Sequence, residues 1–538
     1  MNLYVIAYVL GQVCKCEAGF LMLPMLCAVC YKEWDLVLVY FLSALICLLV
    51  GFFLSLKKPQ PLKIRPKEGM AATALSWLVI SLLGCLPFLM SGEIPHFADA
   101  FFETVSGFTT TGSSILTDLD AMSYASRFWR SFTHWIGGMG VLVFVLAILP
   151  STSSSFMNLM VAESPGPSVS KLVPRVRDTA KYLYGIYIGM TIIQIILLLL
   201  AGMPLFDSLT LTMGTAGTGG FAVRSSGFAD YTLLQQGIIA VFMMLFGINF
   251  SFYFLMIRRK PKQALRMEEV LTYLGIIGSV TAIIAFSVHT FFPSVFETIH
   301  HVFFTVVSIM TTTGYSTVDF NLWPPIAMTL IVLIMFIGAC AGSTGGGIKV
   351  SRINVMIKGI KKELLTLLHP GLVKKVKMDG KPIAHETVRS INVFIAIYLI
   401  TFVVCLLLIT LDGKDLVTNF TAVAATINNI GPGLGEVGPM GNFAGFSDFA
   451  KYVLSFAMLA GRLELLPILL LLVPQMWAGT IRLTKRIGRQ SARERRQNRD
   501  NRSGEKSGEF SDEFGYQPHG GSSGDRYGEP APAHSPSQ

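Results

Sequence analysis

Two stretches of the chain share a threonine-rich sequence whose residue types suit the binding of a dehydrated cation. Residues 101–114 read FFETVSGFTTTGSS and residues 303–316 read FFTVVSIMTTTGYS, so nine positions are identical without a gap. Backbone carbonyls can replace the water shell of a cation, and glycine permits the positive φ that aims successive carbonyls the same way. Threonine adds a hydroxyl oxygen on a stiff, branched side chain. These residue types indicate ion coordination and no covalent chemistry.

The elements that must position these residues are two short helices. Each copy is an apolar piece of about three helical turns that ends in Thr-Thr-Thr-Gly, whereas a bilayer core of about 30 Å needs about 20 residues. Non-helical backbone at membrane depth is tolerated only where it is buried in protein or lines a watery path. The pattern therefore predicts a re-entrant pore helix whose negative end points at the ion. A threonine-rich loop that caps the next helix is the alternative for either copy alone.

The composition excludes an ordinary soluble protein. The chain has 538 residues, of which 52% are hydrophobic and only 14% are charged, and its mean hydropathy is +0.57. This predicts a multi-pass membrane protein, with the first residues forming part of the first span. Most of the eight cysteines fall in apolar stretches. Cys27 and Cys30 have the spacing of a metal or redox pair without a second pair, so we expect apolar packing and no metal or redox site.

The apolar runs predict ten membrane crossings, near residues 3–30, 35–56, 69–91, 127–150, 180–203, 231–257, 266–292, 323–357, 388–411 and 449–482. Five alternate polar segments hold 35 of the 43 lysine and arginine residues. The positive-inside rule then places both termini in the cytoplasm. The net charge of +10 reflects this topology, and nothing in it indicates nucleic-acid binding.

Two weaker copies of the pore segment lie in the corresponding places of the chain. With Gly112, Gly220, Gly314 and Gly431 as reference points, the steps are 108, 94 and 117 residues, which indicates one internal repeat of span, pore helix, filter and span. Four such repeats in one chain predict a pseudo-fourfold arrangement around a central pore. The expected potassium-binding residues are Thr110, Thr111, Gly112, Thr218, Gly219, Gly220, Thr312, Thr313, Gly314, Asn429, Ile430 and Gly431.

The predicted organisation is all-α: two leading transmembrane helices (1–60), four pore repeats (61–160, 161–262, 263–380 and 381–488) and a polar, disordered cytoplasmic tail (489–538). An acidic residue stands near the start of each pore helix, at Asp99, Asp207, Glu297 and Asp415. These carboxylates can cap free N–H groups of the helix, and they can also concentrate cations at an outer mouth. The two roles are compatible.

The eighth predicted span contains five glycines within residues 338–347, including Gly345, Gly346 and Gly347. Each would cost up to about 1 kcal/mol relative to alanine in a helix, so the span should unwind into a loop beneath the pore. Arg462 could donate to carbonyls freed in this loop and hold a gate shut. The alternatives are close helix packing through the small residues and a structural pair of Arg462 with Glu464. For Lys15 and Glu17 in the first span, we expect a structural pair.

The motifs together resemble the TrkH branch of the Trk/Ktr/HKT potassium transporter superfamily. They are GFTTTGSS at 107–114, HWIGGMGV at 134–141, GTGGF at 217–221, GINFSFY at 247–253, TTTGYST at 311–317, AGSTGGGIK at 341–349, NNIGPGLG at 428–435 and GRLELLP at 461–467. The resemblance implies a homodimer with one pore per protomer and a cytoplasmic, nucleotide-binding TrkA-type regulator. It also implies that the four reference glycines line the filter, that Gly112 belongs to the potassium-selective pattern, and that the loop near 338–347 and Arg462 form the gate.

The predicted function is potassium uptake across a bacterial inner membrane, with no enzymatic activity and no cofactor besides the transported ion. Coupling to protons or sodium is the alternative, whereas alternating access would call for inverted repeats, and these four share one direction. His134, His300 and His301 lack the metal-binding pattern or paired carboxylates of an intramembrane enzyme. The glycine-rich residues 433–438 and 342–349 follow no strand of a βαβ unit, so we reject them as nucleotide sites.

Overall fold

The computed structural model describes residues 1–59, 64–140, 176–370 and 375–477. Residues 1–476 form one compact unit, and of the second unit, residues 477–538, only Trp477 is among the described residues. The predicted tail, the end of the tenth predicted crossing and the second half of the fourth therefore lie outside the described part.

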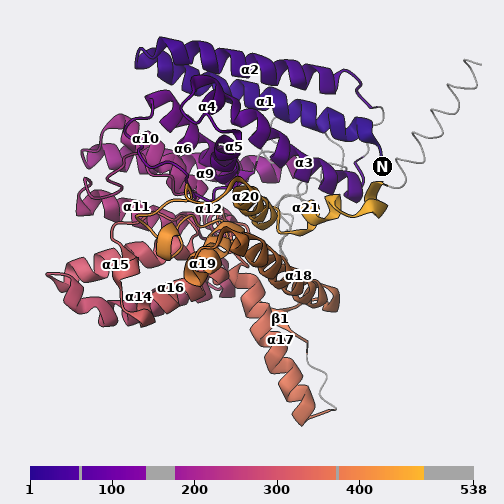
Figure 1. The fold of residues 1–538 in the computed structure, drawn as a ribbon. Coiled ribbons are helices and arrows are strands. Elements are labelled where there is room, and N and C mark those ends of the chain that lie inside the picture. Colours follow the sequence, from indigo (N-terminus) through magenta and orange to yellow (C-terminus); the bar gives the residue numbers. More distant parts are fainter. Residues whose placement is uncertain (60–63, 141–175, 371–374, 478–538) are drawn as a thin grey trace, which may run out of the picture. The chain divides into compact units, whose positions relative to one another are not determined.

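Two long helices lead the chain and lie side by side (Figure 1). They are α1 (Leu3–Cys30) and α2 (Trp34–Ser55), joined by a three-residue turn. A β-carbon on Gly11 would lie 2.8 Å from the carbonyl oxygen of Gly51, and one on Gly51 would lie 2.9 Å from that of Gly11. The two glycines thus let the backbones meet, as small residues do between helices in membranes.

Four repeats follow, each with a first span, a short pore helix and a second span. Repeat 1 contains α3 (Pro66–Gly84), α4 (Leu86–Ser91), α5 (Phe97–Phe108) and α6 (Tyr124–Met139). Repeat 2 contains α9 (Val176–Leu200), α10 (Leu205–Gly217), α11 (Leu233–Phe246), α12 (Phe250–Ile257) and α13 (Pro261–Ala264). Repeat 3 contains α14 (Glu268–Val288), η2 (His289–Phe291), α15 (Val295–Met310), η3 (Phe320–Leu322), α16 (Pro325–Ile337) and α17 (Val350–Leu368). Repeat 4 contains α18 (His385–Ile409), η4 (Thr410–Asp412), α19 (Leu416–Ile427), η5 (Gly435–Val437), α20 (Asp448–Arg462) and α21 (Leu466–Leu471).

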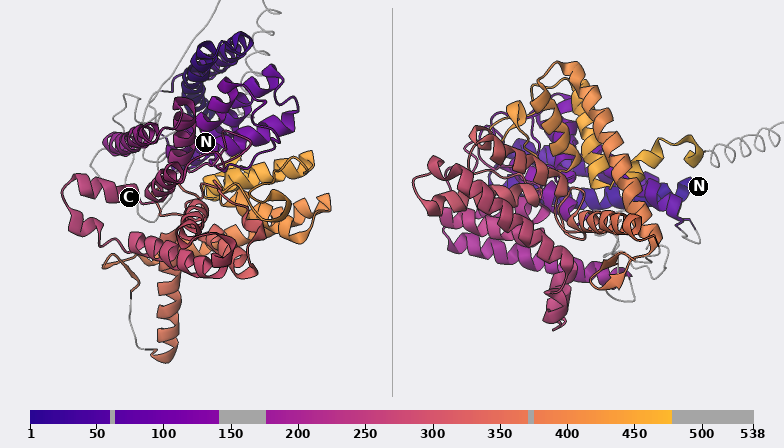
Figure 2. Two further views of the ribbon diagram at one scale, coloured as in Figure 1. Left: turned by 90° about the vertical axis from the view of Figure 1, so that its left-hand side faces the viewer. Right: turned by 90° about the horizontal axis from the view of Figure 1, so that it is seen from below.

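Between repeats 3 and 4 lies a small antiparallel hairpin of β1 (Lys377–Met378) and β2 (Lys381–Pro382), in which Lys377 pairs with Pro382. The helix α17 contacts β1 and projects away from the other helices (Figure 2). Val355, Val376 and Ile391 form a buried cluster that joins α17, the hairpin and α18. The segment is therefore anchored at its base and exposed beyond it.

The pore helices close the repeats into a ring. Besides the spans of its own repeat, α10 packs against α6, α15 against α11 and α19 against α16, so each contacts the second span of the repeat before it. The first pore helix, α5, packs against α20 of the fourth repeat, which completes the cycle. The predicted fold class is thus confirmed as a helical protein with several apolar spans and two leading helices, and the cyclic contacts agree with the predicted pseudo-fourfold arrangement.

The number of uninterrupted crossings is smaller than the ten predicted. Within the described ranges, six helices are long and apolar enough to cross a membrane, and α11 with α12 makes a seventh if this pair, bent by 89°, is one span. The predicted spans at 323–357 and 449–482 are interrupted at 338–349 and 463–465. Helix α6 ends at the edge of the described residues.

The second spans share one property that positions the site. Their first helices, α6, α11, α16 and α20, contain only 16, 14, 13 and 15 residues. At 1.5 Å per residue these reach about 20–24 Å, which is less than the bilayer core. Glycine stands at or beside each end, at Gly140, Gly247, Gly338 and Gly461. The glycine-rich interruption was predicted, and the breaks at 247–249 and 463–465 were not.

Candidate functional site

All four pore helices end in the same backbone motif. In the first, the N–H of Thr110 donates to Gly107 O (3.1 Å) and the N–H of Thr111 to Ser106 O (2.9 Å), and the other three repeat this pair of bonds at equivalent positions. One or two residues beyond the last helical residue the backbone is left-handed, with φ of 56° at Thr110, 54° at Thr218, 60° at Thr312 and 56° at Asn429. This is a Schellman-type ending, which normally uses glycine. Three threonines in this conformation indicate backbone strain of the kind found at functional sites.

A glycine with positive φ follows two residues later in every repeat: Gly112 (81°), Gly220 (78°), Gly314 (86°) and Gly431 (103°). A β-carbon on Gly112 would collide with the carbonyl oxygen of Gly219, one on Gly220 with that of Thr313, and one on Gly314 with that of Ile430. A β-carbon on Gly431 would lie 2.9 Å from Thr111 O. The contacts run from repeat 1 to 2, 3, 4 and back to 1, so the second and third residues of each predicted filter segment meet in one closed ring.

The middle carbonyls of this ring have no hydrogen-bond donor in the described part of the chain. Thr111, Gly219, Thr313 and Ile430 are buried, and no backbone or side-chain donor reaches their oxygens. A buried carbonyl without a partner is costly, and such groups are rare in proteins. A ring of them at the negative ends of four helices can coordinate a dehydrated cation.

The acidic residues at the pore-helix starts have different partners. Asp415 caps α19 by accepting the Thr418 N–H (3.0 Å), and hydrogen bonding to Thr418 lowers the pKa of this carboxyl below its ordinary value. Asp99 forms an ion pair with Lys451 (2.5 Å) and Asp207 one with Arg224 (2.7 Å). Glu297 lies in the first turn of α15. The cap is thus present at Asp415, whereas Asp99 and Asp207 are paired with cations of the protein.

A buried ion pair missed in the sequence supports the first two ring segments. Glu103 in the middle of α5 contacts Arg130 of α6 at 2.7 Å, and both side chains are almost fully buried. Glu103 also accepts from the N–H of Ile115 (3.0 Å), and Arg130 donates to Ala222 O (3.3 Å) beyond the second ring segment. An acid within an apolar pore helix was the only available signal, because its partner stands 27 residues away on another helix.

The histidines have structural partners. His134 lies between the first two repeats, with Nδ1 2.8 Å from Gly107 O and Nε2 accepting the Phe221 N–H at 3.2 Å. This assigns the neutral tautomer protonated on Nδ1. His300 contacts Gln236 (3.0 Å) and His301 contacts Thr317 (2.9 Å). Each side chain thus links the pore region to a neighbouring segment.

The glycine-rich loop lies directly under the ring. The N–H of Gly346 donates to the Thr312 hydroxyl (2.7 Å), and a β-carbon on Gly346 would collide with Asn428 O. Arg462 donates to Thr344 O (2.9 Å), to Gly138 O (2.8 Å) and to Gly137 O. The predicted contact between Arg462 and loop carbonyls is therefore present, and Arg462 also binds the end of α6.

Glu464, which the sequence offered as a structural partner for Arg462, forms an ion pair with Arg352 of α17. Arg352 and Lys349, whose ammonium donates to Gly345 O, were not singled out from the sequence. The expected pair of Lys15 with Glu17 is wrong. Glu17 is buried, and both its carboxylate oxygens lack a hydrogen-bond partner among the described residues. Lys15 does not reach Glu17 because positions two apart do not face each other on a helix.

Several apolar spans, four short helices whose ends meet and a glycine-rich loop next to them are typical of a class of multi-pass membrane protein. The sequence model of the TrkH family, described as cation transport proteins, matches residues 37–479. The potassium uptake protein TrkH of Salmonella typhimurium is 35% identical over 486 residues, which cover 89% of this chain and all of that protein. TrkH of Escherichia coli K12 is 37% identical over 77% of this chain and 87% of its own.

The fold agrees with this relationship. The crystal structure of the potassium transporter TrkH from Vibrio parahaemolyticus superposes with a TM-score of 0.80 at 32% identity, covering 89% of this chain and all of that one. The chain belongs to the TrkH family, as the motifs predicted, and it is a multi-pass membrane protein.

Proposed function

We propose that the chain carries potassium into the cell through the ring formed by residues 110–112, 218–220, 312–314 and 429–431. The observation that carries this proposal is the set of four buried carbonyls, at Thr111, Gly219, Thr313 and Ile430, each of which lies against the glycine of a neighbouring ring segment and has no donor among the described residues. Each would supply one oxygen to an ion that has lost its water. The relatives from Salmonella and Escherichia are named potassium uptake proteins, which agrees with this cargo.

The loop at Gly345, Gly346 and Gly347 is the gate of this pore. Its contacts to Thr312 above and Arg462 beside it hold it under the ring, where it obstructs an ion that leaves the filter. The Arg462 guanidinium adds a positive charge at the same depth, which opposes the passage of a cation. Opening requires that these contacts break.

The working unit we propose is a homodimer in a bacterial cell membrane, with both termini in the cytoplasm and a nucleotide-binding TrkA-type protein as regulator. The exposed part of α17 and the hairpin β1–β2 is the docking surface for this regulator. It carries Lys358, Lys361, Lys362, Lys377 and Lys381 and follows directly on the glycine-rich loop. A partner bound there can pull on the loop through a single helix.

The test is tracer rubidium uptake into liposomes that hold the purified protein. We expect uptake that follows an imposed membrane potential and competes with potassium. Uptake that needs a proton or sodium gradient would show coupled transport instead of conduction through a pore. Uptake no higher than in empty liposomes would contradict the proposal that the protein transports potassium.

A further inference from the structure

Two interrupted spans from different repeats are hydrogen-bonded to one another. The bend between α11 and α12 lies at 247–249, and the glycine-rich loop lies between α16 and α17. The N–H of Cys340 donates to Gly247 O (3.1 Å), and the N–H of Phe250 donates to Gly342 O (3.0 Å). The bend therefore pairs with the first part of the loop, residues 340–342.

One carboxylate joins the bend to both ends of the loop. Glu269 is the second residue of α14 and is 4% exposed. Its Oε1 accepts the N–H groups of Ala341 (2.6 Å), in the first part of the loop, and of Ser351 (3.1 Å), the second residue of α17. Its Oε2 accepts a hydrogen bond from the side-chain amide of Asn249 (3.3 Å). The Oδ1 atom of Asn249 in turn caps α12 by accepting the Ser251 N–H (2.9 Å). Charge-assisted bonds of this kind are stronger than neutral ones.

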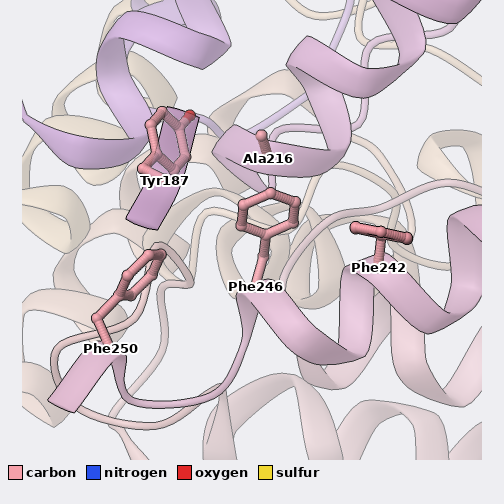
Figure 3. Close-up of a cluster of buried hydrophobic side chains, with 5 residues drawn as sticks. All are labelled: Tyr187, Ala216, Phe242, Phe246 and Phe250. Carbon is pink, nitrogen blue, oxygen red and sulfur yellow. The ribbon is translucent and has the colours of Figure 1, made fainter. Parts of the chain in front are cut away.

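The bend is well supported by packing, so it can serve as a fixed point. Tyr187, Ala216, Phe242, Phe246 and Phe250 form a buried cluster around it, with Phe246 and Phe250 projecting from the two sides of the bend (Figure 3). Residues 343–347 of the loop, by contrast, have no side chain larger than threonine. The base of the loop is thus held by a packed core, and its tip by hydrogen bonds to Thr312, Arg462 and Lys349.

We propose that Glu269 is a positioning residue for the gate, which pins both ends of the loop to the bend of the second repeat so that only the tip, residues 343–347, moves. The inference rests on the loop being the gate. The pin fixes the height of the tip under the ring. Without it, buried N–H groups at Ala341 and Ser351 lose their acceptor, and the tip no longer holds its position below Thr312.

The geometry allows a swap of the hydrogen-bonding pair. In Glu269→Gln, the new amide NH2 faces the Asn249 NH2, so two donors meet. Adding Asn249→Asp restores a donor and an acceptor, because the carboxylate introduced there can accept from the glutamine and still cap the Ser251 N–H. We expect basal rubidium flux to rise about tenfold in Glu269→Gln and to return to within about twofold of the parent protein in the double variant.

The matched control is Glu268→Gln, the preceding residue, whose side chain is about one-third exposed and pairs with Lys358. This change should leave flux and apparent melting temperature unchanged. If Glu269→Gln prevents folding, recovery of folded protein in the double variant supports the pairing, and failure of both variants contradicts it. A merely structural role would change melting temperature without the leak and its rescue.

Arg462→Ala, measured in parallel, separates the two levels of the proposal. If basal rubidium flux rises in Arg462→Ala but not in Glu269→Gln, the positioning role of Glu269 is contradicted and the gate role of the loop stands. If both variants are as tight as the parent protein, the loop is not the gate. A leak in Glu269→Gln that persists in the double variant also overturns the pin.

Discussion

The N–H of Gly346 donates to the Thr312 hydroxyl over 2.7 Å, so the loop beneath the pore is bonded to the ring itself. Thr312 has a left-handed backbone, and its neighbour Thr313 supplies one of the four carbonyls that have no hydrogen-bond donor among the described residues. Closing the loop and shaping the ring are therefore not independent, because one residue takes part in both.

Replacing the Thr312 hydroxyl should weaken closure by a small and measurable amount. Thr312→Val keeps the branched shape and removes an acceptor worth about 1 kcal/mol, which is about a fivefold shift between closed and open loops. We expect basal rubidium flux to rise by that factor, with Thr312→Ser close to the parent protein. A Thr312→Val protein without a leak would show that this bond does not contribute to closure.

Gly112→Ser should reduce discrimination between potassium and sodium. The new β-carbon would collide with the Gly219 carbonyl and sit at φ of 81°, so we expect the flux ratio to fall about tenfold or more. Gly92→Ser is the matched control, because Gly92 has φ of 75° and no atom within 4 Å of a β-carbon. If both substitutions lower the potassium-to-sodium flux ratio equally, the cause is backbone strain and not the contact with the Gly219 carbonyl in the ring.

Arg462→Ala should open the pore in the absence of any regulator. The guanidinium holds carbonyls on the loop and on α6, and charge-assisted bonds contribute about 1.5–3 kcal/mol each, so a rise in basal flux of at least about tenfold is expected. Arg127→Ala, which removes an arginine 3.8 Å from Asp120, should not change flux. Unaltered flux in Arg462→Ala would remove this residue from the gate.

Breaking the Glu103–Arg130 pair should destabilise the protein more than breaking a surface pair. Arg130→Met leaves a buried carboxylate with one fewer partner, at a cost of about 3–5 kcal/mol. Lys358→Met disrupts a pair that is about one-third exposed and should cost less than about 1 kcal/mol. The check is the apparent melting temperature of the purified proteins. Equal melting temperatures would mean that the buried pair contributes little.

The residues of the ring could be predicted because each signal was local. Thr-Thr-Thr-Gly marked the first and third segments, and the spacing of glycines located Gly220 and Gly431. Five glycines in ten residues likewise predicted the break after Ile337, since their helix propensity is poor.

Partners distant in sequence could not be found in this way. Glu103 and Arg130 stand on separate helices, and Glu269 reaches the loop 72 residues further on. The bend at 247–249 lies within the apolar run 231–257, which has only two isolated glycines, so the length of the run favoured one straight span. The predicted Lys15–Glu17 pair was wrong because it rested on opposite charge alone. Residues two positions apart point to different faces of a helix, so the two side chains do not meet.

The ring is assembled from four unlike segments of one polypeptide, with threonine before the glycine in repeats 1 and 3, glycine in repeat 2 and isoleucine in repeat 4. In the proposed filter, a point mutation therefore alters one quarter of the ion's surroundings and leaves three untouched. Such a protein can be adjusted in small steps, whereas a tetramer of identical subunits changes all four quarters at once.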